Sequence, residues 1–243
     1  MSTFIDHREI SRFDTLAETW WQPAGPMWPL HRLNELRAPY ICDQAVTHLL
    51  KKTDPLRPLH GLKLLDIGCG AGLLSESMAR LGASVTALDP SPRNIDIACN
   101  HAHQQRLAID YRLGSLESLR PGELFDLVLN MEVVEHVEDP MRFISASCAR
   151  TRPGGLHVLA TINRTPWSWL IAIVGAEYAL RWLPKGTHQW SKFVKPSELE
   201  QRLVRHHHHI RDRKGVFIDP LSKRFSLTGR SSVNYMVVAQ RAR

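Results

Sequence analysis

Short apolar runs and amphipathic segments alternate along the chain from residue 63 onward. Each run has the length of a strand, and the segments between several of them carry apolar residues at helical spacing. The pattern predicts strands at residues 63–67, 84–88, 109–113, 125–131, 157–162 and 234–240, and helices at 72–81 and 92–106. Because strands that alternate with helices form parallel sheets, we predict an α/β fold with a Rossmann-like, doubly wound, mostly parallel sheet.

Two stretches depart from this alternation. The first sixty residues predict an N-terminal helical cap, with helices at 9–20 and at 37–52, the second beginning around Pro39. Residues 163–195, after the fifth strand, are longer than a simple connection needs, so we expect a functional insertion at the ligand-binding edge of the sheet. We therefore expect a single domain with a cap (1–60), a core (61–162), an insertion (163–195) and a C-terminal part of the core (196–243).

The first predicted strand leads into a glycine-rich turn, DIGCGAG at residues 66–72. Glycine lets the backbone adopt positive φ and approach a ligand closely. A dinucleotide-binding loop would carry its third glycine one position later, where Leu73 stands. The spacing instead resembles the first motif of S-adenosylmethionine (SAM)-dependent methyltransferases. Asp89, at the end of the second strand, could accept both ribose hydroxyls. The alternative is a glycine turn in an unrelated α/β protein.

Composition and charge narrow the class of protein. The four cysteines show no Cys-x-x-Cys spacing, which favours reduced thiols over disulfides or a zinc site. No apolar run approaches the ~20 residues of a membrane span, and the N-terminus lacks the apolar region of a signal peptide. We therefore expect a cytoplasmic protein. The net charge of +7 favours an anionic partner, either nucleic acid or acidic lipid headgroups.

A second group of candidate residues follows the fourth strand. If a helical turn begins at Glu132, then Glu132, Glu135 and His136 share one face of it. Two carboxylates and an imidazole could hold a divalent cation such as Mg²⁺. They could also form a general base, with His136 oriented by a carboxylate. The plainer alternative is a helix N-terminus with acids in its first turn and a solvated histidine.

Several blocks together resemble one family, the ubiquinone biosynthesis O-methyltransferases. The matching blocks lie at residues 6–13, 20–21, 29–37, 68–72, 131–137, 161–164, 174–188, 193–199 and 233–236. The resemblance implies a SAM-dependent enzyme that methylates a hydroxyl of a polyprenylated catechol or quinol, at two steps of ubiquinone synthesis. It also implies Mg²⁺ or another divalent cation as a second cofactor. Other enzymes of that synthesis are candidate partners.

The resemblance also implies roles for individual residues. Arg37 would contact the SAM carboxylate, Gly68 would lie against the cofactor, Asp89 would bind the ribose and Met131 would line the site. The other residues expected at the cofactor are Asp66 and Gly70. Glu132, Glu135 and His136 would supply the metal ligands or the base. The chain departs from the family pattern at Ala71, Pro90 and residues 112–115, which leaves the adenine contacts undefined.

The insertion carries an apolar segment with tryptophans near both ends, at residues 167–182, followed by basic residues. This pattern is typical of an interfacial helix at headgroup depth, and we expect peripheral binding to the anionic inner face of a bacterial membrane. A lid helix packed on the protein core is the alternative. The histidines at 206–209 are interpreted as the solvated start of a strand and as an incidental metal binder unrelated to catalysis. An RNA methyltransferase and a non-catalytic SAM-binding scaffold are weaker alternatives, and no nucleic acid is expected.

Overall fold

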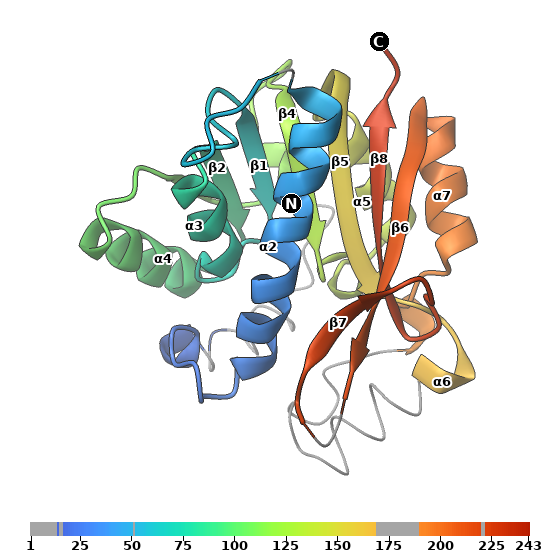
Figure 1. Cartoon of the computed structure of the whole chain (residues 1–243), viewed down its shortest axis with the longest axis horizontal. Coiled ribbons are helices and arrows are strands. Elements are labelled where there is room, and N and C mark those ends of the chain that lie inside the picture. Colours follow the sequence, from blue (N-terminus) through green and yellow to red (C-terminus); the bar gives the residue numbers. More distant parts are fainter. Residues whose placement is uncertain (1–13, 15–16, 51, 169–189, 220–221) are drawn as a thin grey trace.

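The computed structural model describes residues 14, 17–50, 52–168, 190–219 and 222–243. In this part of the chain the strands form one sheet in the order β3-β2-β1-β4-β5-β8-β6-β7 (Figure 1). Strands β1 to β5 are mutually parallel, whereas β8 lies antiparallel between β5 and β6. The strands are β1 (Lys63–Ile67), β2 (Ser84–Asp89), β3 (Asp110–Leu113), β4 (Phe125–Met131), β5 (Thr151–Ile162), β6 (His208–Ile218), β7 (Phe225–Thr228) and β8 (Asn234–Arg241).

Helices cover both faces of the sheet. The described helices are α2 (Trp28–Leu49), α3 (Leu73–Arg80), α4 (Pro92–Gln104), α5 (Pro140–Cys148), the short α6 (Pro166–Ser168) and α7 (Pro196–Arg205). Side chains alternate between the faces of a strand, so Leu64 packs with α2, α3 and α4, while Leu65 packs with α5 and α7. The two apolar clusters fix the sheet rigidly, and with it the edge where β1, β2 and β4 end.

The doubly wound, mostly parallel sheet is confirmed. The predicted bounds of β1 and β4 match, and those of β2, β3 and β8 differ by one residue. Strand β5 begins earlier than predicted, at Thr151. The histidines at 206–209 mark the start of β6 as interpreted, but the rest of β6 and all of β7 were not predicted, since β6 alternates exposed and half-buried positions that mostly carry charged side chains.

Two predictions near the helices are wrong. Helix α2 begins at Trp28, and Pro39 lies inside it rather than at its start. A proline in a helix interior removes one backbone hydrogen bond, but buried neighbours such as Tyr40 and Ile41 hold this helix against the core. His208 is buried, not solvated, because it enters β6 on the face covered by α7.

Two predicted segments lie largely outside the described residues. Of the helix expected at 9–20, the structure describes residue 14 and the short 3-10 turn Ala17–Thr19 with its neighbours. Of the amphipathic segment at 167–182, it describes residues 167 and 168. No helix among the described residues combines the length and apolar character needed to cross a membrane.

Candidate cofactor and catalytic site

The glycine turn after β1 is tightly covered by its neighbours. Gly68 and Gly70 have φ of +69° and +54°, a region that glycine adopts without strain. A Cβ at Gly68 would meet the side chain of Val133, and one at Gly70 would meet the indole of Trp20. The indole of Trp21 also donates a hydrogen bond of 3.0 Å to the Ala71 carbonyl. The turn is therefore both left-handed and closely packed, and a larger residue at either glycine would displace it.

Asp89 ties the second strand to this turn. Its carboxylate accepts hydrogen bonds from the Gly70 amide at 2.9 Å, the Ser91 amide at 3.0 Å and the Asn94 side chain at 3.2 Å. Burial raises the pKa of Asp89, and these donors oppose that shift. The predicted ribose ligand thus lies beside the glycine turn, as the spacing indicated.

Asp66 lies under the turn, fully inside the protein. It accepts a hydrogen bond of 2.6 Å from the Ser75 hydroxyl on α3. Burial, with a smaller contribution from the charge of Asp89, raises the pKa of Asp66 to about 7. A carboxyl of this kind is protonated in about half of the molecules near neutral pH.

Arg37 reaches the site from α2. Its guanidinium is buried and forms an ion pair with Glu132, which follows β4. The Nε of Arg37 has no hydrogen-bond partner among the described residues, although buried donors rarely stay unpaired. The Nε–H of Arg37 is therefore a candidate donor for an anionic group of a ligand.

Glu132 does not begin a helical turn. Its φ is +57°, and the 3-10 turn that follows covers Val134–His136. The prediction that Glu132, Glu135 and His136 share one helical face is therefore wrong in its geometry. A left-handed residue after a strand reverses the chain direction, which brings Glu132 back toward α2.

The carboxyls of Glu132 and Glu135 nevertheless lie together. Glu135 is 4 % exposed and accepts a hydrogen bond of 2.8 Å from the Thr161 hydroxyl on β5. Burial, and then the negative charge of Glu132, raise the pKa of Glu135 well above its usual range. A proton or a cation that the two carboxyls share would lower the repulsion between their charges.

The third predicted ligand, His136, is half-buried at the end of the 3-10 turn. Among the described residues, the group that brings three ligand atoms within 4.8 Å of one another is Cys148, His157 and His208. The trio of Glu132, Glu135 and His136 does not meet that distance. Two carboxyls therefore lie together here, and the imidazole lies farther away.

Some polar residues at this edge were not predicted. Met131 ends β4 beside the glycine turn, as expected, and Asn130 precedes it with a fully buried side chain. Neither amide atom of Asn130 has a partner among the described residues. Thr161 was also missed as a partner of Glu135. Such contacts join separate strands, so no local spacing in the sequence could have indicated them.

Comparisons with known proteins agree with this geometry. A family model described as a methyltransferase domain matches residues 33–207. A ubiquinone biosynthesis O-methyltransferase of Methylobacterium sp. is 52 % identical over 98 % of this chain and 96 % of its own length. One from Bradyrhizobium sp. is 50 % identical over 97 % and 93 %.

The fold comparison points the same way. The crystal structure of a magnesium protoporphyrin IX methyltransferase from Synechocystis, with bound SAM, superposes with a TM-score of 0.64 at 16 % identity, covering all of both chains. At that identity the likeness concerns the fold alone. The family match, the close relatives and the glycine turn beside Asp89 together show that this chain is a SAM-dependent methyltransferase and belongs to the ubiquinone biosynthesis O-methyltransferases.

Proposed function

We propose that the enzyme transfers the methyl group of SAM to a hydroxyl of a catechol-like ring that carries a polyprenyl tail, at two steps of ubiquinone synthesis. The observation that carries this proposal is the identity of 52 % over nearly the whole chain with a relative named for ubiquinone biosynthesis O-methylation. The paired acids next to the glycine turn support it, because a SAM-binding scaffold without catalysis would have no need of two adjacent carboxyls, one of them buried.

In this proposal, different residues bind different parts of the SAM molecule. The free donor of Arg37 suits the SAM carboxylate, since a guanidinium binds carboxylates strongly. Asp89 would accept the ribose hydroxyls with lone pairs that its backbone partners leave open. Gly68, Gly70 and Met131 would line the cofactor.

The chemistry needs a proton acceptor. A phenol has a pKa of about 10, as tyrosine does, so the attacking oxygen is mostly protonated at neutral pH. His136 could take this proton directly, and the rate would further depend on holding oxygen and methyl group in line. The site fits a hard cation in part, because the carboxyls of Glu132 and Glu135 lie together. Burial and then the charge of Glu132 raise the pKa of Glu135, and a cation would relieve the repulsion between the two charges. Bound there by Glu132, Glu135 and His136, Mg²⁺ would lower the pKa of the phenol.

One turnover assay tests both the metal and the base. Methyl transfer from SAM to two demethylated catechol substrates would be measured with Mg²⁺, after chelation, and after Mg²⁺ is restored. We expect chelation to abolish turnover and Mg²⁺ to restore it. Glu135→Gln should lose activity while keeping SAM affinity, whereas Glu138→Gln, at an exposed acid of the same loop, should keep both. Full activity without metal would leave His136 as the base, and no transfer to either catechol would refute the substrate class.

We further propose that the enzyme collects its substrate at the cytoplasmic face of an anionic membrane, through residues 167–182. A polyprenyl tail partitions into lipid, since each buried CH₂ contributes about 0.8 kcal/mol. The net charge of +7 suits acidic lipid. Vesicle flotation should show binding that rises with acidic lipid and falls with salt. If polar replacements of Trp167, Trp169 and Ile173 do not reduce flotation, the membrane contact lies elsewhere.

A further inference from the structure

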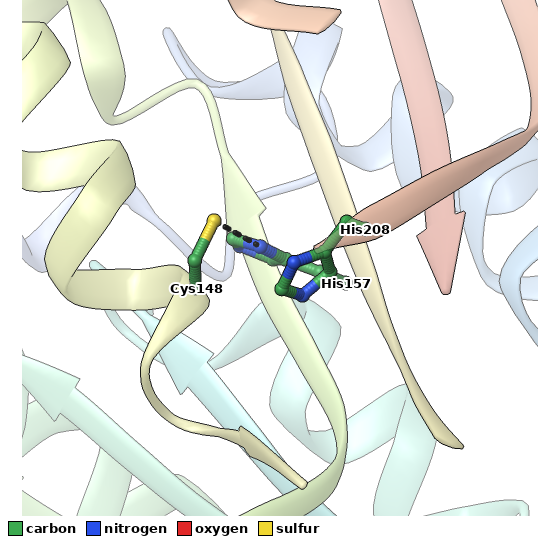
Figure 2. Close-up of side chains that lie close together, drawn as sticks. All are labelled: Cys148, His157 and His208. Carbon is green, nitrogen blue, oxygen red and sulfur yellow. Dashed lines mark hydrogen bonds between the residues drawn. The ribbon is translucent and has the colours of Figure 1, made fainter. Parts of the chain in front are cut away.

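Three potential metal ligands meet inside the protein, away from the cofactor site. Cys148 ends α5, His157 lies on β5 and His208 begins β6, and their side chains lie close together (Figure 2). All three residues are at most 1 % exposed. The Cys148 sulfur lies 3.7 Å from Nδ1 of His157, and the two imidazole centroids are 5.9 Å apart. One ligand atom from each residue lies within 4.8 Å of the others. Three separate elements thus converge on one point.

The hydrogen bonds of His208 prepare it as a ligand. Its Nδ1 donates to the His206 carbonyl at 2.8 Å, so the neutral ring carries its lone pair on Nε2. Burial lowers the pKa of His208 to about 4, which keeps the ring neutral near pH 7. Nε2 has no partner among the described residues. Metal-bound histidines commonly show this pattern, in which one nitrogen donates to a backbone carbonyl and the other faces the ion.

His157 and Cys148 complete the cluster. Burial lowers the pKa of His157 well below its usual range, and its Nε2 has no partner in the described part of the chain either. Burial raises the pKa of the Cys148 thiol to about 12, while the nearby Arg241 and Arg202 favour the thiolate. A buried imidazole nitrogen without a partner is costly in an apolar core, and a cation held by the Cys148 sulfur, Nδ1 of His157 and Nε2 of His208 would satisfy the nitrogen of His208.

We propose that Cys148, His157 and His208 bind a single Zn²⁺ ion that links α5, β5 and β6. Zinc–sulfur and zinc–nitrogen bonds of ~2.3 and ~2.0 Å in a tetrahedron place sulfur and nitrogen ligands about 3.6 Å apart, close to the observed 3.7 Å. Thiolate and imidazole ligands suit Zn²⁺ and exclude Mg²⁺. On binding, the Cys148 thiol releases its proton to solvent and forms a sulfur–zinc bond, which leaves a fourth position for water.

The site is structural and separate from methyl transfer. His157 pairs with Val128 on β4, three residues before Met131 at the cofactor edge, a separation of about 10 Å along a strand. Its surroundings are the apolar cluster that α5 and α7 form with the sheet. The ion would therefore fasten the strand that follows the insertion to the core of the parallel sheet.

Cobalt titration of the metal-stripped full chain tests this proposal. Co²⁺ bound by a thiolate gives a charge-transfer absorption band, and we expect this band to saturate at one ion per chain and to disappear on adding Zn²⁺ but not Mg²⁺. Cys148→Ser should abolish the band, and His208→Gln should weaken Co²⁺ binding at least about tenfold, as for loss of one metal ligand. Zn²⁺ should also raise the thermal midpoint of the parent protein and not that of His208→Gln.

Neighbouring residues provide matched controls. His207 and His209 flank His208 and are exposed, and Cys99 is an exposed thiol. The pair His207→Asn with His209→Gln, and separately Cys99→Ser, should leave the band and its stoichiometry unchanged. A band that survives Cys148→Ser, or that these surface variants remove, would show adventitious binding and overturn the proposal. So would a folded parent without any band. If Cys148→Ser fails to fold by circular dichroism, His157→Asn and His208→Gln decide the outcome.

Discussion

Replacing Asp66 with asparagine should remove a pH dependence that this buried carboxyl imposes on folding. The carboxyl is fully enclosed, and its pKa is raised from 3.8 in the unfolded chain to about 7 in the folded protein. A group with a raised folded-state pKa stabilises the protein when protonated, and this contribution is lost as the pH rises through the folded pKa. The parent protein should therefore lose stability relative to the variant as the pH rises from about 5 to about 8.

The size of this effect follows from the two pKa values. A pKa difference of one between the folded and unfolded states corresponds to about 1.4 kcal/mol. At about pH 5 the unfolded carboxyl is already ionised, whereas the folded one keeps its proton until about pH 7, roughly two pH units higher. The difference in unfolding free energy between variant and parent should therefore change by about 2.7 kcal/mol over this range. Asparagine keeps an oxygen to accept the Ser75 hydrogen bond of 2.6 Å, so the comparison isolates the charge.

Urea unfolding of both proteins at several pH values measures this difference without SAM. Other titrating groups are common to the two proteins and cancel in the subtraction. As a second variant, Ser75→Ala removes a hydrogen bond that lowers the pKa of Asp66, so it should extend the pH-dependent loss to higher pH. A difference between parent and Asp66→Asn that stays flat from about pH 5 to about pH 8 would refute the raised pKa.

Three further variants address the cofactor site. Asp89→Ala should weaken SAM binding by ~1.5–3 kcal/mol, the range for hydrogen bonds to a charged group. If calorimetry shows unchanged SAM affinity in a folded variant, Asp89 does not bind the ribose. Gly70→Ala should cost ~2–4 kcal/mol in urea unfolding, because strained φ adds to overlap with the neighbouring indole. As a control, Gly122→Ala should cost only ~1 kcal/mol, because Gly122 has a φ of +75° but open space around it. Equal losses of unfolding free energy in the two variants would contradict the close packing around Gly70. Arg37→Met should destabilise the protein by about 1–3 kcal/mol, because it removes the cation that balances the half-buried Glu132. A double-mutant cycle with Glu132→Gln that shows no coupling would disprove the ion pair.

The parallel half of the sheet was predictable because its signals are local. Strands β1 and β4 are mostly apolar and mostly buried on both faces, and a polar or glycine-rich turn follows each of them. Their carboxyl ends place Gly68 and Met131 at one edge, so the site could be located from sequence order alone.

The contacts that define the site's chemistry were not predictable in the same way. The left-handed Glu132 pairs with Arg37, ninety-five residues earlier in the chain. The cluster of Cys148, His157 and His208 has no Cys-x-x-Cys spacing, since three separate elements supply it. Strand β6 alternates charged and half-buried residues, and its partner β8 lies farther along the chain. Each of these features depends on tertiary packing, which single-sequence patterns do not record.

The position of β8 has a consequence for the order of assembly. This strand occupies an interior place in the sheet, with β5 on one side and β6 on the other, yet the chain reaches it after both of them. Until β8 docks, β5 and β6 each present an open row of backbone donors and acceptors, the kind of edge that pairs with other chains. The buried residues Tyr235 to Ala239 fill the place between the two strands. Misassembly between copies should therefore begin at this gap, and a free peptide of the β8 sequence should compete for it during refolding.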